Sequence, residues 1–107
     1  MAENQGALTE AVYYILLSLF EPMHGYGIMQ NVKQLSRGRV SLGAGTLYGA
    51  MNTLVEKGWI SLCTEQQDER KKEYVITSEG RDAVEAEIQR LAELLQNGQQ
   101  VIGGSLK

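Results

Sequence analysis

The chain has 107 residues, 43% of them hydrophobic, and a formal net charge of −3, which are the proportions of one small folded domain and exclude a disordered chain. No apolar run approaches the 18 or so residues of a membrane span, no basic and then apolar leader opens the chain, and its single cysteine cannot form an internal disulfide. We therefore expect a cytoplasmic protein without a membrane partner. From Pro22 to Gly58, however, four basic residues accompany one acidic residue, so the negative total does not exclude a nucleic-acid partner.

A first helix is predicted from about Leu8 to Phe20, before Pro22 breaks it. It carries two apolar stripes at helical spacing, one made of Leu8, Val12, Ile15, Leu16 and Leu19 and the other of Tyr13, Leu17 and Phe20. Two stripes need two buried faces. In a domain this small, one enters the core and the other calls for a partner chain or an unusually deep position.

The segment HGYGI, from His24 to Ile28, predicts a glycine-rich turn that leads into a second helix. His24 is expected as a turn or cap residue. The helix should direct Ile28, Val32 and Leu35 inward, and Val40 is expected to form a minimal strand after it.

The stretch SLGAGTLYGAMNTLVEKGWI, from Ser41 to Ile60, predicts a recognition helix followed by a strand. Ser41 is the expected N-cap and Gly58 the expected stop. The predicted buried face consists of Leu47, Met51, Leu54 and Val55. Gly43, Gly45 and Gly49 each cost a helix about 1 kcal/mol relative to alanine. Two explanations stay open at this point: close approach to a DNA backbone, or tight packing against a neighbouring helix.

Two short strands, Trp59 to Thr64 and Lys72 to Ile76, predict a hairpin around the polar segment Glu65 to Lys71. Thr77 or Ser78 should cap a final helix that frays near Gly98. That helix carries a heptad-like stripe of Val84, Ile88, Leu91 and Leu95. With only about two heptads, packing against another helix is expected, and not a long coiled coil.

Catalytic and metal-binding constellations are missing from the sequence. The one histidine has no second ligand at metal spacing, and no carboxylate pair stands in an apolar setting. We expect neither an enzyme nor a cofactor or metal site. Cys63 is expected as a small, half-buried side chain on its strand.

Four segments in this order, LTEAVYYILLSLF, HGYGI, GTLYGAMNTLVEKGWI and ERKKEYVITSEGR, resemble the PadR family of transcriptional regulators from Leu8 to about Leu95. The resemblance implies an α+β, mostly α, fold. A winged helix-turn-helix DNA-binding domain would occupy residues 1–77, and a C-terminal dimerisation helix residues 78–107. It also implies a homodimeric repressor that binds an inverted-repeat operator in double-stranded DNA and is released by a small hydrophobic effector.

Site residues are carried over from this resemblance by position. Tyr26 and Tyr48 match tyrosines that reach the DNA backbone, where a phenol can donate to a phosphate oxygen. The full expected DNA-binding set is Tyr26, Ser41, Gly45, Thr46, Tyr48, Asn52, Arg70, Lys71 and Lys72. The expected dimer interface is Tyr13, Leu17, Phe20, Val84, Ile88, Leu91 and Leu95. For the basic wing residues, a solvated charged loop is the ordinary alternative.

The sequence also departs from the family pattern. The recognition helix has no arginine or lysine before Lys57, so the bidentate arginine contact to guanine is not available from its leading turns. The wing carries three carboxylates, those of Glu65, Asp68 and Glu69. Some short members hold aromatic drugs between tryptophans of their last helices, whereas the last helix here has no aromatic residue. An effector would have to meet the region of Tyr13, Leu17, Phe20 and Leu91. A winged helix that contacts another protein, without specific DNA binding, therefore remains the alternative function.

Overall fold

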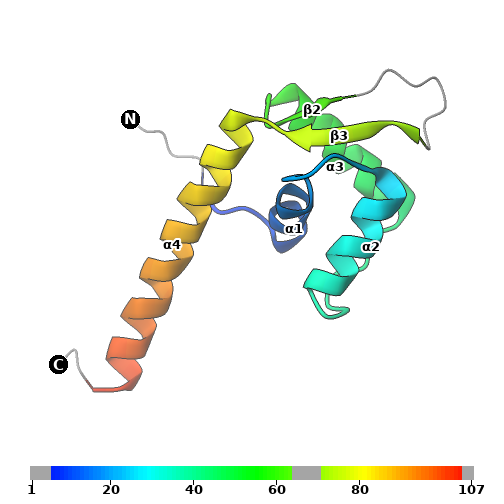
Figure 1. Ribbon diagram of the computed structural model, residues 1–107. Helices are drawn as coiled ribbons and strands as arrows, with labels where there is room; N and C mark the ends of the chain where they lie inside the picture. Colours follow the sequence, from blue (N-terminus) through cyan, green and yellow to red (C-terminus); the bar gives the residue numbers. More distant parts are fainter. Residues whose placement is uncertain (1–5, 64–70, 105–107) are drawn as a thin grey trace.

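The structure is a computed structural model that describes residues 6–63 and 71–104. Its elements, in chain order, are α1 (Glu10–Ser18), β1 (Met23–His24), α2 (Gly25–Leu35), α3 (Ala44–Glu56), β2 (Ile60–Leu62), β3 (Glu73–Ile76) and α4 (Ser78–Ile102). Helix α4 projects beyond the body formed by the other elements (Figure 1). The radius of gyration is accordingly 16.0 Å, against about 13 Å for a compact chain of this length. The mostly helical α+β fold with a long last helix is confirmed.

The sheet has three antiparallel strands in the order β1-β3-β2. The predicted hairpin is confirmed, with Ile60 opposite Ile76. The strand expected at Val40 is wrong, because the third strand is Met23–His24 and pairs with β3. The backbone N–H of Val40 instead donates to the side-chain oxygen of Ser36 at 3.0 Å, so a loop contact takes the group that a strand would need.

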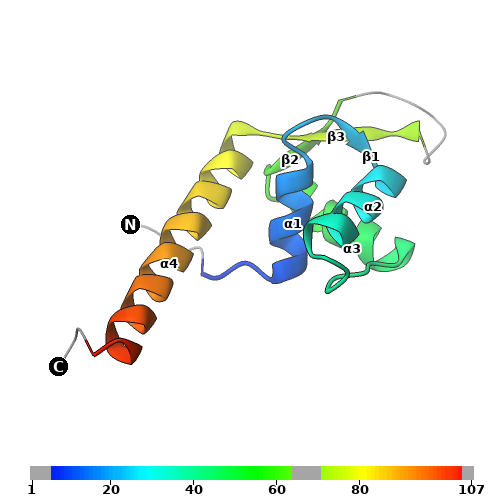
Figure 2. The same cartoon turned by 60° about the horizontal axis from the view of Figure 1, so that its bottom comes forward.

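The core lies where α1 is enclosed by α4 on one side and α2 on the other (Figure 2). Its buried apolar side chains come from every helix, from the residue after α1 and from β2 and β3, namely Ile15, Leu16, Leu19, Ile28, Val32, Leu47, Met51, Leu54, Ile60, Ile76, Ala83 and Val84. Leu35 and Val55, expected inside, are exposed. Leu35 is the last residue of α2 and Val55 the last but one of α3, where the chain leaves the packed face.

Val84 also differs from the expectation. It is expected in a dimer interface, but it is only 1% exposed and belongs to the chain's own core. The first turns of α4 pack on α1 and β3, so the apolar stripe of α4 begins as core and becomes surface only further along the helix.

Side chains cap three of the four described helices. Thr9 Oγ1 accepts from the N–H of Val12 at 3.1 Å, and His24 Nδ1 accepts from the N–H of Gly27 at 3.3 Å. Thr77 Oγ1 accepts from the N–H of Gly80 at 3.1 Å. The caps expected at His24 and Thr77 are therefore confirmed.

Other helix ends differ from the expectation. Ser41 is not the N-cap of α3, because the helix begins after Gly43, which has no side chain to donate or accept. Gly58 follows the end of α3 with a φ of +79°, which confirms it as the stop. Gly98 does not fray α4, which continues to Ile102.

Glu87 is a buried charged residue of α4. Its side chain is 3% exposed, and its carboxylate accepts from Arg90 Nη2 at 2.6 Å, from Arg90 Nε at 3.0 Å and from the N–H of Leu8 at 3.4 Å. The hydrogen bonds from Arg90 are the main reason that the pKa of Glu87 is lowered. The segment before α1 is thereby tied to α4.

We predict that Gly80→Ala destabilises the fold, because the added Cβ would overlap the carbonyl oxygen of Trp59 and lie 2.7 Å from Cγ1 of Ile76. Overpacking of this kind costs about 1–3 kcal/mol. Gly49→Ala is the matched control inside α3, because its Cβ would meet nothing within 4 Å, and it should stabilise by about 0.5–1 kcal/mol. Urea denaturation at one protein concentration measures both free energies of unfolding. Equal stabilisation by the two substitutions would contradict the Gly80 contact.

Candidate nucleic-acid interface

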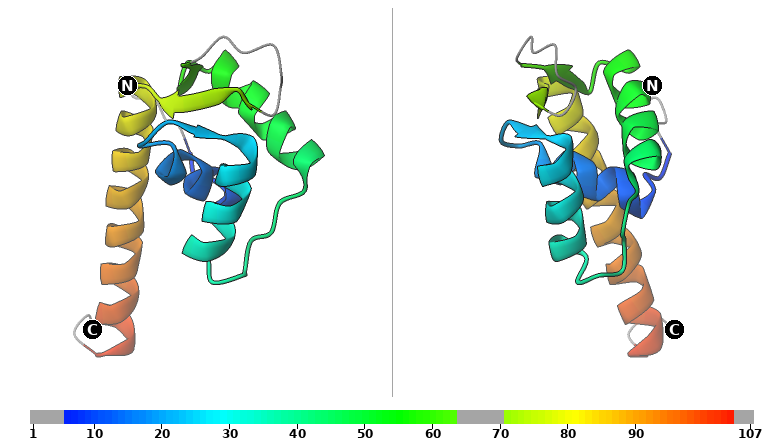
Figure 3. Two further views of the ribbon diagram at one scale, coloured as in Figure 1. Left: turned by 45° about the vertical axis from the view of Figure 1, so that its right-hand side comes forward. Right: turned by 90° about the vertical axis from the view of Figure 1, so that its right-hand side faces the viewer.

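Helices α2 and α3 pack against each other and form the helix-turn-helix (Figure 3). Residues at the start of both helices, and from β1, line one depression of about 400 Å³. The lining side chains are His24, Tyr26, Met29, Ala44 and Tyr48. Two helix N-termini, with the positive ends of their dipoles, therefore flank the same hollow.

Tyr48 is fixed against the first residue of α2. A Cβ on Gly25 would overlap the hydroxyl oxygen of Tyr48 and lie 2.7 Å from its Cζ, so the phenol lies directly on the Gly25 backbone. Tyr26, the next residue, is 63% exposed. The structure thus brings the two sequence-predicted tyrosines to one place, and it adds Gly25, which sequence reasoning missed. The available signal was a glycine in the turn HGYGI, where the absence of a Cβ permits close approach of another group.

The start of α3 is open. Gly45, Thr46, Gly49 and Asn52 are all exposed, and a Cβ at Gly43, Gly45 or Gly49 would meet nothing within 4 Å. Tight packing inside the chain therefore does not explain these glycines. Because no side chain caps α3, its first N–H groups remain available to an anion or water.

The wing is the hairpin formed by β2 and β3, and its base adjoins the start of α2. His24 pairs with Glu73 at the edge of β3, which places Lys71 and Lys72, the residues just before Glu73, beside this region. Lys71 is exposed and Lys72 half-buried. Arg70 and the wing carboxylates lie outside the described residues. Ser41 is exposed in the loop before α3.

Basic side chains do not gather on α3. Arg39 forms an ion pair with Glu10 at 3.0 Å, and the ammonium of Lys57 lies 4.7 Å from the centre of the Trp59 ring. Lys33 and Arg37 stand at the far end of α2 and just beyond it. The local excess of positive charge is therefore spread around the domain.

A second exposed surface runs along the outer half of α4. Ile88, Leu91 and Leu95 are 46%, 40% and 61% exposed, and Tyr13 and Leu17 of α1 are half-buried. Phe20 is 37% exposed, and Arg81 lies over its ring at 4.7 Å.

Within residues 6–63 and 71–104, no three or more metal-ligating side chains form a group that could hold a metal ion. No helix of this part of the chain is long and apolar enough to cross a membrane. Cys63, expected half-buried, is exposed, and its thiol donates to the carbonyl oxygen of Glu73 at 3.2 Å.

The sequence profile of the transcriptional regulator PadR-like family matches residues 14–86, more than half of the chain. The chain belongs to the PadR-like family of transcriptional regulators. Regulators of this family bind DNA and are not enzymes, which agrees with the sequence-based expectation. No curated protein shows significant sequence similarity to the chain.

Solved structures carry the same fold as this PadR-like chain. RosR from H. salinarum is 24% identical with a TM-score of 0.67, over 92% of this chain and 93% of that one. A PadR family transcription regulator from hypervirulent Clostridium difficile is 25% identical with a TM-score of 0.65, over 85% and 97%. A transcriptional regulator from Clostridium thermocellum is 23% identical with a TM-score of 0.61, over 91% and 92%. The winged helix-turn-helix fold is thereby confirmed.

We predict that Gly25→Ala destabilises the PadR-like chain by about 1–3 kcal/mol in the wild-type background, because the new methyl group collides with Tyr48. In a Tyr48→Ala background the collision partner is gone, so the same substitution should be close to neutral. A double-mutant cycle of unfolding free energies measures this coupling. Additive effects would show that Tyr48 does not rest on Gly25.

Proposed function

We propose that this PadR-like chain is a homodimeric repressor that binds an inverted-repeat operator in double-stranded DNA. The observation that carries the proposal is the open, glycine-rich start of α3 beside two tyrosines. Gly45 and Thr46 are exposed at an uncapped helix N-terminus, and Tyr26 and Tyr48 line the adjoining depression. A surface of unpaired N–H groups and phenol donors suits phosphate oxygens.

In the proposed complex, contacts to phosphate groups supply most of the binding. Tyr26 and Tyr48 donate to the DNA backbone, the first N–H groups of α3 face a phosphate or groove edge, and Lys71 and Lys72 extend the contact along the strand. Thr46 and Asn52 are exposed on the same helix, and we expect them to contact base edges or, for Asn52, a phosphate. Because the exposed face of α3 bears no arginine, sequence preference rests on few direct contacts and on DNA shape.

The outer half of α4 supports the proposed dimer. Its exposed apolar side chains include Leu94 at 54%, Val101 at 59% and Ile102 at 89%, in addition to the Ile88, Leu91 and Leu95 stripe. A second copy that covers this stripe removes apolar surface from water. Two-fold pairing also presents two α3 helices to successive major grooves, which is why the operator should be an inverted repeat.

A small hydrophobic effector would release the repressor by occupying the region between α1 and α4. Tyr13, Tyr14 and Leu91 line a hollow of about 260 Å³ there. Because this hollow adjoins the proposed dimer surface, occupancy changes how the two subunits, and hence the two α3 helices, are spaced.

We predict that Tyr26→Phe and Tyr48→Phe each weaken DNA binding by roughly 2-fold to 10-fold per subunit, the effect of one hydrogen bond worth about 0.5–1.5 kcal/mol. Phenylalanine keeps the ring of residue 48 on Gly25 and removes only the hydroxyl. Tyr14→Phe, on α1, is the matched control and should leave affinity unchanged. Fluorescence anisotropy with labelled duplex measures the three constants.

Unchanged affinity in both tyrosine variants would contradict the proposed contacts. If the wild-type protein retains DNA only at the non-specific level at about 0.15 M salt, the alternative of a winged helix that contacts another protein replaces the operator-binding function.

We predict that Leu91→Glu shifts the protein towards monomer in sedimentation velocity, because it places a charge in the proposed α4 interface. Gln89→Glu adds the same charge about 200° around the helix and should leave the dimer intact. If the Leu91→Glu dimer is as stable as the wild-type dimer, the main interface is formed by α1 and not by α4.

A further inference from the structure

His24 is exposed at the depression between the starts of α2 and α3, which it lines together with Tyr26 and Tyr48. It is the only histidine of the chain. The proposed contacts to the DNA backbone use the two tyrosines and leave the imidazole of His24 without a role beyond the cap of α2. The geometry of that cap decides which ring nitrogen is able to bind a further group.

The cap selects one protonation state of the imidazole. Nδ1 of His24 accepts from the N–H of Gly27 at 3.3 Å, so Nδ1 is the ring nitrogen without a hydrogen. In a neutral imidazole, the other nitrogen, Nε2, then carries the hydrogen. A doubly protonated ring is unable to form this cap, because both of its nitrogens are donors. The capped form of His24 is therefore a neutral ring with its N–H at Nε2.

This Nε2–H group is available as a donor. Among the residues that the structure describes, the side chain of His24 forms the cap as its one hydrogen bond, and no group accepts from Nε2. The backbone of His24 is held by pairing with Glu73 of β3. A Cβ on Gly27 would lie 3.0 Å from Nδ1, so the ring lies against the first turn of α2. The donor is therefore held in place at the edge of the depression.

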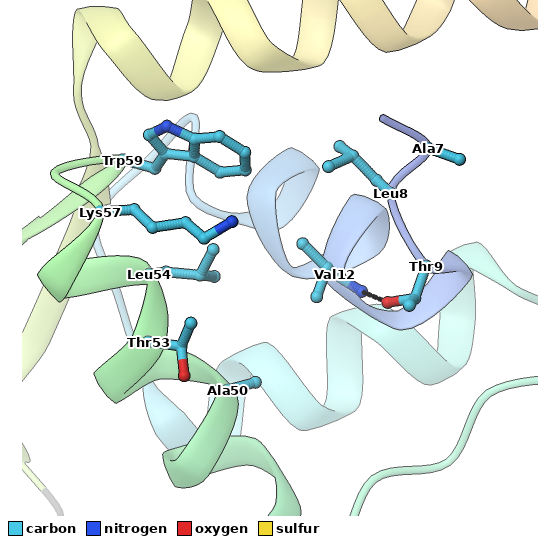
Figure 4. A pocket seen from close by; sticks show the side chains of 9 residues that line it. All are labelled: Ala7, Leu8, Thr9, Val12, Ala50, Thr53, Leu54, Lys57 and Trp59. Carbon is cyan, nitrogen blue, oxygen red and sulfur yellow. Dashed lines mark hydrogen bonds between the residues drawn. The ribbon is translucent and has the colours of Figure 1, made fainter. Parts of the chain in front are cut away.

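The side chains around this donor are uncharged as well. The hydroxyl of Tyr48 lies on the backbone of Gly25, the residue after His24, and no lysine or arginine is among the described residues that line the depression. Lys57, which caps the other end of α3, extends over Trp59 towards α1 (Figure 4). A group that enters the depression therefore meets N–H and O–H donors of neutral side chains, which suit a phosphate oxygen.

We propose that His24 is a further contact to the DNA backbone, in which the neutral imidazole donates its Nε2–H to a phosphate oxygen. The inference rests on the proposed DNA-binding function and assigns a role to a residue outside the expected DNA-binding set. One nitrogen of the ring closes the start of α2 and the other binds DNA. Because the ring is uncharged, the contact adds affinity without releasing a counterion from the DNA.

The single histidine makes the position of the hydrogen directly measurable. In untagged, isotope-labelled full-length protein, nitrogen NMR signals of an imidazole come from His24 alone. Without DNA, we expect a hydrogen on Nε2 and none on Nδ1. Addition of a duplex that the protein enriches from a random pool should shift the Nε2 signal and slow exchange of its hydrogen with water. A hydrogen on Nδ1, or a doubly protonated ring in the complex, would overturn the inference.

The variant His24→Ser separates the DNA contact from the cap. Serine is a favourable N-cap residue, so the start of α2 should be retained, whereas the short hydroxyl no longer reaches the phosphate. We expect DNA binding to weaken roughly 2-fold to 10-fold per subunit, with an unchanged melting temperature. His24→Ala removes both the cap and the contact and should lower the affinity and the melting temperature together. Unchanged affinity of His24→Ser shows that the contact is not made.

The salt dependence of binding distinguishes a neutral donor from a cation. The slope of log affinity against log salt concentration should be the same for His24→Ser and the wild type, because no counterion release is lost. Lys71→Gln is the charged comparison and should make the slope shallower by about one unit. If His24→Ser changes the slope as much as Lys71→Gln does, the contact is made by a cation and the inference is wrong.

Failure of the proposed function would look different. If the wild type enriches no duplex and holds DNA only at the non-specific level, the DNA-binding function and the His24 contact are both rejected. If the wild type binds an enriched duplex and His24→Ser binds it equally well, the function stands and only the His24 contact is rejected.

Discussion

The fold depends on the junction where α4 begins against the turn that ends α3. Thr77 Oγ1 donates to the carbonyl oxygen of Gly58 at 2.6 Å, and the N–H of Thr77 donates to the carbonyl oxygen of Trp59 at 2.9 Å. Gly80 then lies so close to Trp59 that no side chain fits. These contacts fix the recognition helix relative to α4, the helix proposed to join two subunits. In the proposed dimer, the spacing of the two α3 helices would depend on this junction.

The candidate DNA-binding surface consists more of exposed backbone N–H groups than of charged side chains. Arg39 is neutralised by Glu10 and Lys57 stands over Trp59, so the basic residues counted in the sequence are not gathered on α3. The open glycines at the start of α3, in contrast, have no internal packing role. Their free N–H groups and the two tyrosines can hold a phosphate without net positive charge. This division of roles explains how an acidic chain carries the fold of a DNA-binding regulator.

The apolar periodicity and the capping and turn residues of the sequence were enough to predict all four helices, the hairpin and the caps at His24 and Thr77. These features depend on residues that are neighbours in the sequence. Long-range contacts were not predictable in this way. Strand β1 exists because β3 offers an edge to Met23 and His24. Glu87 is buried because Arg90 and Leu8 satisfy its carboxylate, and Val84 is core because the start of α4 packs inward. In the candidate site, Tyr26 and Tyr48 could be proposed from the family resemblance. The contact of Tyr48 with Gly25 could not be predicted, because it joins residues of two different helices.

We propose that the open start of α3 reads DNA as one half of a two-fold pair. The most direct measurement is selection of duplexes from a random pool by the purified protein at two salt concentrations, followed by sequencing of the retained DNA. We expect an enriched inverted repeat, with half-sites about one helical turn apart, that persists at the higher salt. Retention without enrichment, lost at the higher salt, would contradict it and leave only a weakly attractive surface.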